Sequence, residues 1–334
     1  MRSSRLFKVP ALAASLVALA AALSPRPAAA VAGPWAEAKE AKVRLLSRYA
    51  AAPPGGDAGL GVEFQLAPGW HVYWKNAGDA GYAPALEPEG GALVAPQLRY
   101  PVPSRFDLPG GLVAFGYEHE VVYPLDGRLA PGAPSPVQLA AQLDYLVCAE
   151  SCIPYTVRLA LELPLAAPGA EPALDPNVAP LVDRGRDRLP AAAPEGVRGR
   201  LLPGEGEAMT LELTFAVPGV RATTPDLFFE PHELLDLRRP EPIETAEGPG
   251  FRVPLRPLDE TKPLPDRLRF AWTASGLELG GTPLAWEGVL DVERPGPAPV
   301  SGVARYAAVA LLASALIWFV LRRGRIHRAS PRQP

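Results

Sequence analysis

The chain has 334 residues and a formal net charge of −3, a length that accommodates two domains of ordinary size. This charge gives no support for a nucleic-acid partner, because nucleic-acid-binding proteins carry a strongly basic face. Proline is abundant, with 42 residues, and glycine adds 31. Because proline is excluded from helix interiors and central strands, this composition favours many short strands joined by turns over a helical bundle.

The first 30 residues have the pattern of a secretory signal peptide. Arg2, Arg5 and Lys8 form a basic region, an apolar stretch follows from Val9 to Leu23, and small residues that suit a signal peptidase come next. An uncleaved membrane anchor is the alternative interpretation. The short apolar run and the small residues directly after it favour cleavage, so we expect residues 1–30 to be removed on export.

Residues 31–165 are rich in strand signals. Apolar runs and alternating patterns are separated by turn signals such as PPGGD, PGG and LDG. Several short strands at this spacing predict an antiparallel β-sandwich. The fold class is therefore expected to be all-β.

Residues 166–199 change in character and are rich in proline, alanine and charge. We interpret them as a linker that holds one short helix. Asp175 and Pro176 have the residue types that begin a helix, which would extend to Leu189. Pro180 and Gly185 weaken this prediction, because both residues disfavour a helix interior.

Strand signals return in residues 200–295, which we interpret as a second, smaller β domain. An apolar run follows at residues 303–321, and its length is that of one transmembrane helix. Its single charge, Arg305, lies near one end, where its side chain can reach the membrane interface. The tail, residues 322–334, begins with RRGRIHR, and the positive-inside rule places such a segment in the cytoplasm. A buried helix of a soluble domain is the alternative, which the dense arginines disfavour.

The chain has two cysteines, Cys148 and Cys152, with three residues between them. The segment LDYLV predicts a strand that leads into Cys148, and a second strand follows Cys152, so the cysteines lie at the tip of a predicted hairpin. A disulfide closing so short a loop adds only about 2 kcal/mol of stability in the chain-entropy model. Loop tips are accessible, and exposed or strained disulfides exchange readily. The spacing alone supports a redox role and a structural role about equally.

Three segments together resemble a known family. The hairpin, the stretch PGWHVYWKNAGDAGYAPAL at residues 68–86 and the stretch FGYEHEVVYPL at residues 115–125 are similar to the N-terminal periplasmic domain of the thiol:disulfide interchange protein DsbD. The similarity is greatest to the branch that includes the ScsB suppressor-of-copper-sensitivity proteins, and it covers roughly residues 40–165. The resemblance implies an immunoglobulin-like β-sandwich that relays reducing equivalents, as a component of a protein-disulfide reductase.

The resemblance also implies roles for individual residues. Cys152 would be the nucleophile that forms a mixed disulfide with the partner, and Cys148 would resolve it. The family shields its cysteines with an aromatic cap segment, which corresponds to residues 115–120 here. Phe115 or Tyr117 would then cover the sulfur atoms, although ordinary core packing is the alternative for each ring. We expect Tyr73 and Trp74 to be core or sheet-face residues.

The implied partners are periplasmic thioredoxin-like proteins, disulfide isomerases and proteins of cytochrome c maturation. The chain departs from the family in two ways: its cysteines are closer together than in the best-known members, and it lacks the multi-helix electron-transporting module and the C-terminal thioredoxin-like domain. We therefore expect a separate multi-spanning membrane reductase as electron donor. The expected location is the inner membrane, with one helix, the body in the periplasm and the C-terminus in the cytoplasm. The predicted thiol–disulfide exchange needs no cofactor and no metal.

Two other functions stay open at this point. The first is copper binding in a copper-tolerance protein. A C-x3-C pair followed by proline also occurs in copper chaperones of the Sco type, and thiolates suit Cu(I). His71 or His119 could supply a third copper ligand. However, two cysteines are a weak metal signal. The second alternative is a non-catalytic anchored sandwich with a structural disulfide. Hydrolase and nucleotide-binding motifs such as G-x-S-x-G, the P-loop and H-E-x-x-H are missing from the sequence.

Overall fold

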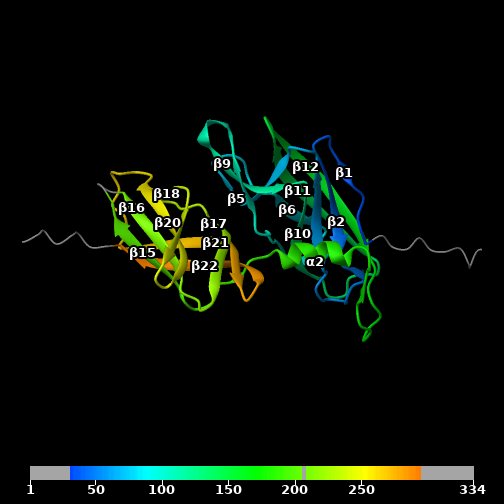
Figure 1. Ribbon diagram of the computed structural model, residues 1–334. Helices are drawn as coiled ribbons and strands as arrows, with labels where there is room; N and C mark the ends of the chain where they lie inside the picture. The colour runs from blue at the N-terminus through cyan, green and yellow to red at the C-terminus, as the bar shows by residue number, and fades with distance from the viewer. Residues whose placement is uncertain (1–30, 205–207, 295–334) are drawn as a thin grey trace, which may run out of the picture.

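The computed structural model describes residues 31–204 and 208–294. These residues form two β lobes, joined by a segment that contains the helix α2 (Figure 1). Within the described residues no helix is long and apolar enough to cross a membrane. The predicted signal peptide, the predicted transmembrane helix at 303–321 and the basic tail all lie outside the described residues.

The first lobe is a sandwich of two antiparallel sheets, as the strand and turn signals predicted. One sheet has the strand order β1-β2-β4-β10-β7, and its strands are β1 (Ala36–Glu37), β2 (Ala41–Ser47), β4 (Leu60–Leu66), β7 (Leu93–Leu98) and β10 (Glu120–Leu129). The other has the order β12-β11-β5-β9-β8, with β6 also paired to β11. Its strands are β5 (His71–Gly78), β6 (Ala85–Glu89), β8 (Ser104–Asp107), β9 (Val113–Glu118), β11 (Val137–Cys148) and β12 (Cys152–Leu163). Two short strands, β3 (Tyr49–Ala51) and β13 (Ala173–Leu174), pair outside these sheets, and a 3-10 turn, η1, spans Pro109–Gly111.

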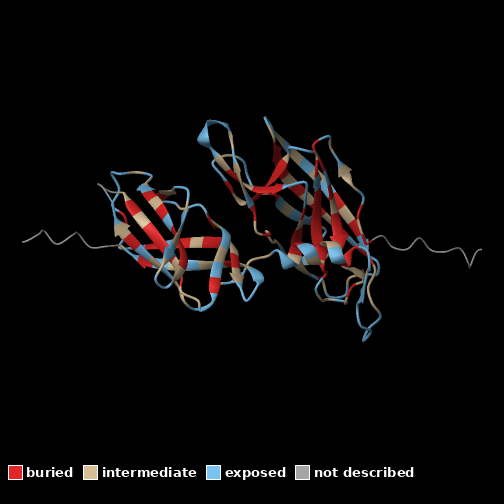
Figure 2. Cartoon of the chain, viewed as in Figure 1, coloured by how far each residue is buried: buried red, intermediate tan, exposed pale blue. Residues whose placement is uncertain are grey.

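The core of this lobe lies between the two sheets (Figure 2). Along β2, the residues Ala41, Val43 and Leu45 alternate with more exposed ones, the period-two pattern of a strand with one buried face. Phe64 of the first sheet meets Tyr145 of the second edge-to-face, with ring centroids 5.1 Å apart. Such an aromatic pair adds about 0.5–1.5 kcal/mol beyond its buried area, so it helps to hold the sheets together.

The linker contains the helix α2 (Ala179–Asp187), which is shorter than the predicted Asp175–Leu189. The Asp175 carboxylate accepts hydrogen bonds from the turn that precedes the helix. Pro180 lies in the first turn, where a missing N–H costs no helical hydrogen bond. Gly185 is buried against β10, and a Cβ there would lie 2.5 Å from the Val122 carbonyl oxygen. Both residues that weakened the helix prediction therefore have a place in it.

The second lobe is a smaller sandwich with its own core, also as predicted. One sheet has the order β14-β22-β21-β17, with strands β14 (Ala191–Ala192), β17 (Val220–Phe229), β21 (Arg267–Leu279) and β22 (Thr282–Glu293). The other has the order β15-β16-β20-β18, with β19 paired to β20, and its strands are β15 (Val197–Pro203), β16 (Met209–Phe215), β18 (Leu235–Leu237), β19 (Glu241–Thr245) and β20 (Gly248–Pro257). Phe215 bridges the sheets, with its ring 5.6 Å from that of Trp272 and 6.1 Å from that of Trp286.

Candidate functional site

The two cysteines close the tip of the β11–β12 hairpin. The two strands pair in continuous antiparallel register from Val137 opposite Leu163 to Cys148 opposite Cys152. The turn between them is Ala149–Ser151, where the Ala149 N–H donates to the Ser151 carbonyl oxygen at 3.1 Å. This register brings the cysteine Cα atoms to 4.1 Å, and the two sulfur atoms form a disulfide. The long paired strands thus fix the position of the disulfide.

The two sulfur-bearing residues differ sharply in exposure. Cys148 is buried, with 2% of its surface exposed, whereas Cys152 is exposed. Thiol–disulfide exchange needs an attacking thiolate to reach one sulfur of the disulfide, and access decides which sulfur is attacked. Cys152 is therefore the residue of the disulfide that is accessible from solvent, whereas Cys148 is covered.

The face of the sheet around the disulfide follows from strand register. Cys148 lies opposite His71 of β5, and His71 lies opposite Glu118 of β9. Residues directly opposite one another point to the same face of a sheet, as do residues two positions apart along a strand. Leu146 and Tyr73 therefore share this face, and both belong to one buried cluster with Cys148.

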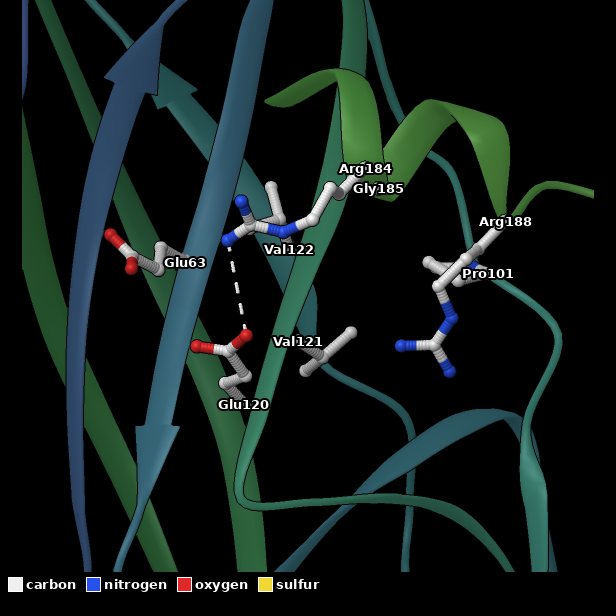
Figure 3. Close-up of a pocket in the computed structure, with 8 residues that line it drawn as sticks. All are labelled: Glu63, Pro101, Glu120, Val121, Val122, Arg184, Gly185 and Arg188. Atoms are coloured by element: carbon white, nitrogen blue, oxygen red, sulfur yellow. Dashed lines mark ion pairs between the residues drawn. The ribbon is translucent and has the colours of Figure 1, made fainter. Parts of the chain in front are cut away.

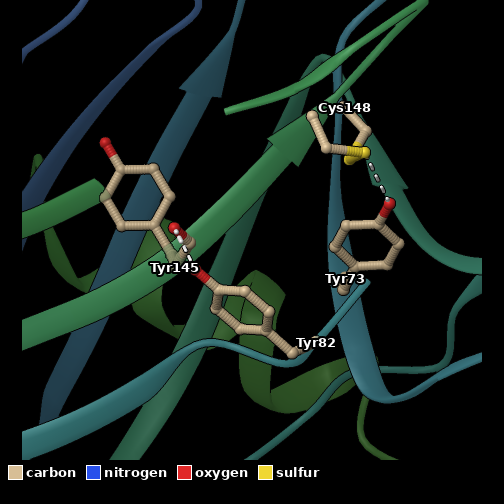
Figure 4. Close-up of a disulfide and its surroundings, with 5 residues drawn as sticks. Tyr73, Tyr82, Tyr145 and Cys148 are labelled. Atoms are coloured by element: carbon tan, nitrogen blue, oxygen red, sulfur yellow. Dashed lines mark hydrogen bonds between the residues drawn. A yellow bond between two sulfur atoms is a disulfide. The ribbon is translucent and has the colours of Figure 1, made fainter. Parts of the chain in front are cut away.

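Tyr73 places a hydroxyl group next to the sulfur atoms. Its hydroxyl oxygen lies 3.8 Å from Cys152 Sγ (Figure 4). Burial raises the pKa of the Tyr73 hydroxyl above its usual value, so the group stays protonated and can donate to sulfur. A donor at this place stabilises the thiolate that forms when the disulfide is reduced. The adjacent residues Tyr73 and Trp74 point to opposite faces, so only Trp74 enters the main core.

His71 lies beside the disulfide on the same face. Its ring stacks on Phe106 at 5.1 Å and meets Tyr73 edge-to-face at 5.1 Å. The side chain is 4% exposed, and its Nε2 atom has no hydrogen-bond partner among the described residues. Burial lowers the pKa of His71, while the nearby Glu118 carboxylate acts in the opposite direction. The imidazole is therefore neutral at pH 7.

A known protein family matches the part of the chain that contains the disulfide. Residues 42–164 match the family model described as "Thiol:disulfide interchange protein DsbD, N-terminal". This segment is similar to DsbD N-terminal domains. It contains both sheets of the first lobe almost entirely, together with the disulfide hairpin. No curated protein sequence matches the chain.

Two solved structures are also similar to the chain. The chain is similar to the N-terminal periplasmic domain of ScsB from Proteus mirabilis, with a TM-score of 0.60 and 20% identity over 79% of this chain and 99% of that one. This likeness concerns the fold, and it covers more of the chain than the first lobe. The N-terminal domain of Neisseria meningitidis DsbD in its reduced form is 18% identical, covering 36% of this chain and 85% of that one. Its TM-score of 0.25 is too low to support an argument about the fold.

Within the first lobe, Phe115 and Tyr117 lie on the other face of the sheet. Tyr117 is opposite Val72, one position from the His71–Glu118 pair, so its side chain points away from the disulfide. Its hydroxyl donates to the Pro101 carbonyl oxygen at 2.5 Å, and both rings pack with the main core. The structure thus places the two predicted cap residues in the core and does not bring them to the cysteines.

Two other apolar residues pack on the face of the sheet that carries the disulfide. Phe106 of β8 and Leu108, which follows that strand, pack against the cluster that contains Cys148 and Tyr73. Neither residue could be predicted as part of the site, because the segment RFDL carries no motif that distinguishes it from an ordinary edge strand. A pocket of about 420 Å³ is lined in part by Phe106 and Glu118.

The two histidines considered as metal ligands are far from equivalent. His71 is beside Cys148, whereas His119 is exposed at the junction of β9 and β10, with a positive φ of 63°. Among the described residues no group of three or more His, Cys, Asp or Glu side chains is arranged to hold a metal ion. No observation on this site therefore favours the copper alternative.

A separate small cavity of about 140 Å³ lies between α2 and β10 (Figure 3). Arg184 and Arg188 approach it from the helix side, and Glu63 and Glu120 from the strands. The one ion pair drawn, between Arg184 and Glu120 at 3.8 Å, joins side chains that are more than half exposed, and such pairs contribute little. The lining contains no cysteine, so this cavity is not part of the disulfide site.

Proposed function

We propose that the protein is a membrane-anchored periplasmic module that relays reducing equivalents to partner proteins by thiol–disulfide exchange through Cys148 and Cys152. The observation that carries this proposal is the asymmetric disulfide at the hairpin tip of a lobe that is similar to DsbD N-terminal domains, with Cys152 exposed and Cys148 buried. The membrane anchor and the location rest on the apolar run at 303–321, the basic tail and the signal-peptide pattern.

In the proposed reaction the reduced pair acts as the donor. The Cys152 thiolate attacks one sulfur of the partner's disulfide, a mixed disulfide forms, and the partner's second sulfur leaves as a thiolate that takes up a proton. The Cys148 thiolate then attacks Cys152 Sγ, which restores the Cys148–Cys152 disulfide and releases the partner as a dithiol. Two electrons pass to the partner, and each step exchanges one S–S bond for another.

The surroundings of the sulfur atoms fit this sequence of steps. The protonated Tyr73 hydroxyl can donate a hydrogen bond to the Cys152 thiolate without neutralising it. Neutral His71 adds no charge beside Cys148. The sequence contains one pair of cysteines, which is consistent with re-reduction by a dithiol of another protein. We propose a multi-spanning membrane reductase as that donor and thioredoxin-like periplasmic proteins as acceptors.

The test uses two single variants of the full chain in detergent. Cys148→Ser leaves the exposed thiol and is expected to accumulate a mixed disulfide with an oxidised thioredoxin-like protein, because no resolving thiol remains. Cys152→Ser leaves only the buried thiol and is expected to trap far less, and the double variant serves as the blank. If neither single variant forms a mixed disulfide, or if Cys152→Ser traps more than Cys148→Ser, the proposed roles are wrong.

A further inference from the structure

Three strands of the first lobe have the disulfide cluster on one face and the second lobe on the other. These strands are β5, β8 and β9. In β8, Phe106 packs against the disulfide cluster, whereas the preceding Arg105 pairs with the second lobe. In β9, Ala114 belongs to the disulfide cluster and Phe115 contacts Phe228 of the second lobe. Successive residues of a strand point to opposite faces, so the two environments share one backbone.

Phe228 is the apolar part of this contact. It lies on β17 of the second lobe, yet it is a member of the first lobe's core and is 1% exposed. Its neighbours Leu227 and Phe229 belong to the core of the second lobe, because strand alternation points them the other way. The Phe228 ring lies 5.8 Å from Trp74 and 5.3 Å from Phe115, both edge-to-face.

Arg105 and Asp226 are the polar part. The guanidinium donates two hydrogen bonds to the carboxylate, from Nη2 at 2.7 Å and from Nε at 3.0 Å, and Nη2 also donates to the Leu227 carbonyl oxygen at 2.9 Å. The Arg105 side chain is 9% exposed, and its guanidinium lies 4.8 Å from the ring of Phe115 and 5.3 Å from that of Phe228. A bidentate pair in this setting is geometrically specific, so it fixes the position of β8.

A second ion pair between strand β8 and the second lobe, Asp107–Arg239 at 3.0 Å, joins side chains that are more than half exposed, and such pairs contribute little. Strand β8 has four residues, Ser104–Asp107, lies at the edge of its sheet and pairs with β9. A short edge strand has few backbone hydrogen bonds to hold it. Since Arg105 and Phe106 are adjacent, the contact that holds Arg105 also holds the Phe106 ring on His71 and on the disulfide cluster.

We propose that the second lobe is a positioning element for the redox site: through Asp226 and Arg105 it holds Phe106 against the cluster that contains Cys148 and so controls access to the buried Cys148 side of the disulfide. The biological meaning of this control rests on the proposed function, but its physical effect does not. When the Asp226–Arg105 contact is weakened, β8 becomes more mobile and a small dithiol also reaches Cys148. The disulfide is then reduced faster.

The experiment measures the rate at which dithiothreitol reduces the disulfide in the oxidised full chain, read by thiol alkylation. Asp226→Asn is expected to raise this rate at least about fivefold, the lower end of typical coupling between two sites. Phe106→Ala is expected to raise it as well. In the Phe106→Ala background Asp226→Asn should add little, because both changes act through the same ring. Glu247→Gln, which weakens the exposed Arg198–Glu247 pair of the second lobe, is the matched control with no expected effect.

Arg105→Lys is a second variant in case Asp226→Asn lowers the melting temperature too far. It keeps the charge and removes the fork that makes the pair bidentate, so the reduction rate should again rise. An unchanged rate in folded Asp226→Asn or Arg105→Lys overturns the proposal, as does an effect of Asp226→Asn that persists in full in the Phe106→Ala background. Normal mixed-disulfide formation together with an unchanged rate of reduction by dithiothreitol would refute only the positioning role of the second lobe. A changed rate without any protein exchange would refute only the proposed function.

Discussion

Replacing Phe228 with alanine tests whether the second lobe completes the core of the first. The side chain is buried, contacts two aromatic rings and lies under the Arg105 guanidinium. Phe-to-Ala changes in well-packed cores cost about 3–5 kcal/mol of unfolding free energy, and the edge-to-face ring pairs contribute about 0.5–1.5 kcal/mol of such a loss each. We expect a loss in this range, which is a large fraction of the total stability of an ordinary domain.

The assay is urea unfolding of the full chain in detergent, followed by tryptophan fluorescence. Trp74 lies against Phe228, so its emission should shift to longer wavelength in the folded variant as water reaches the ring. Val289→Ala on β22 is the control, because Val289 is 49% exposed and changes at such sites stay within about 0.5 kcal/mol. A loss below about 1 kcal/mol for Phe228→Ala, with unchanged Trp74 emission, would refute the reasoning that this ring belongs to the first lobe's core.

Three further predictions concern single residues. Gly185→Ala should destabilise the fold by about 1–3 kcal/mol, because the added Cβ meets the Val122 carbonyl oxygen; a neutral effect in urea unfolding would contradict the close contact of α2 with β10. Burial lowers the pKa of His71, so the unfolded chain binds its proton at higher pH, and the stability due to neutral His71 is complete above about pH 6.5 and is lost as the pH falls through the folded pKa. His71→Gln should therefore flatten the fall in unfolding free energy below about pH 6.5 by up to about 1.4 kcal/mol per pH unit, and an unaltered slope would contradict the burial argument. In iodoacetamide assays of the single-cysteine variants, Cys148 should react about tenfold or more slowly than Cys152, because a local opening that costs 1.4 kcal/mol already gives that factor; equal rates would contradict the asymmetry.

Local sequence patterns were sufficient to predict the first sandwich, a second β domain and the hairpin. Strand alternation and turn residues act over short distances, so segments such as LDYLV and YTVRLALEL indicate two strands with a tight turn between them. The position of the cysteines at the hairpin tip followed directly and is confirmed by the pairing of Cys148 with Cys152. The short linker helix was also foreseen, although its ends were not.

The surroundings of the disulfide required information that local patterns do not hold. A shift of one residue in strand register moves a side chain to the opposite face of a sheet, and the segment FGYEHE does not reveal its own register. The family resemblance predicts Phe115 or Tyr117 over the sulfur atoms, with core packing as the alternative, and the observed register places both rings in the core. The same register brings Tyr73, predicted only as a core or sheet-face residue, to the sulfur atoms. The contribution of Phe228 depends on the packing of two lobes, a long-range contact with no signature in the sequence.

The central claim is that the Cys148–Cys152 disulfide exchanges with partner proteins. The most direct measurement is its reduction potential in the full chain, titrated against a thiol–disulfide buffer and read by alkylation and mass. Because Cys152 is exposed and exposed disulfides have more oxidising potentials than structural ones, we predict a value above about −300 mV. A disulfide that stays oxidised well below that potential would be a structural bond, and the exchange function would be wrong.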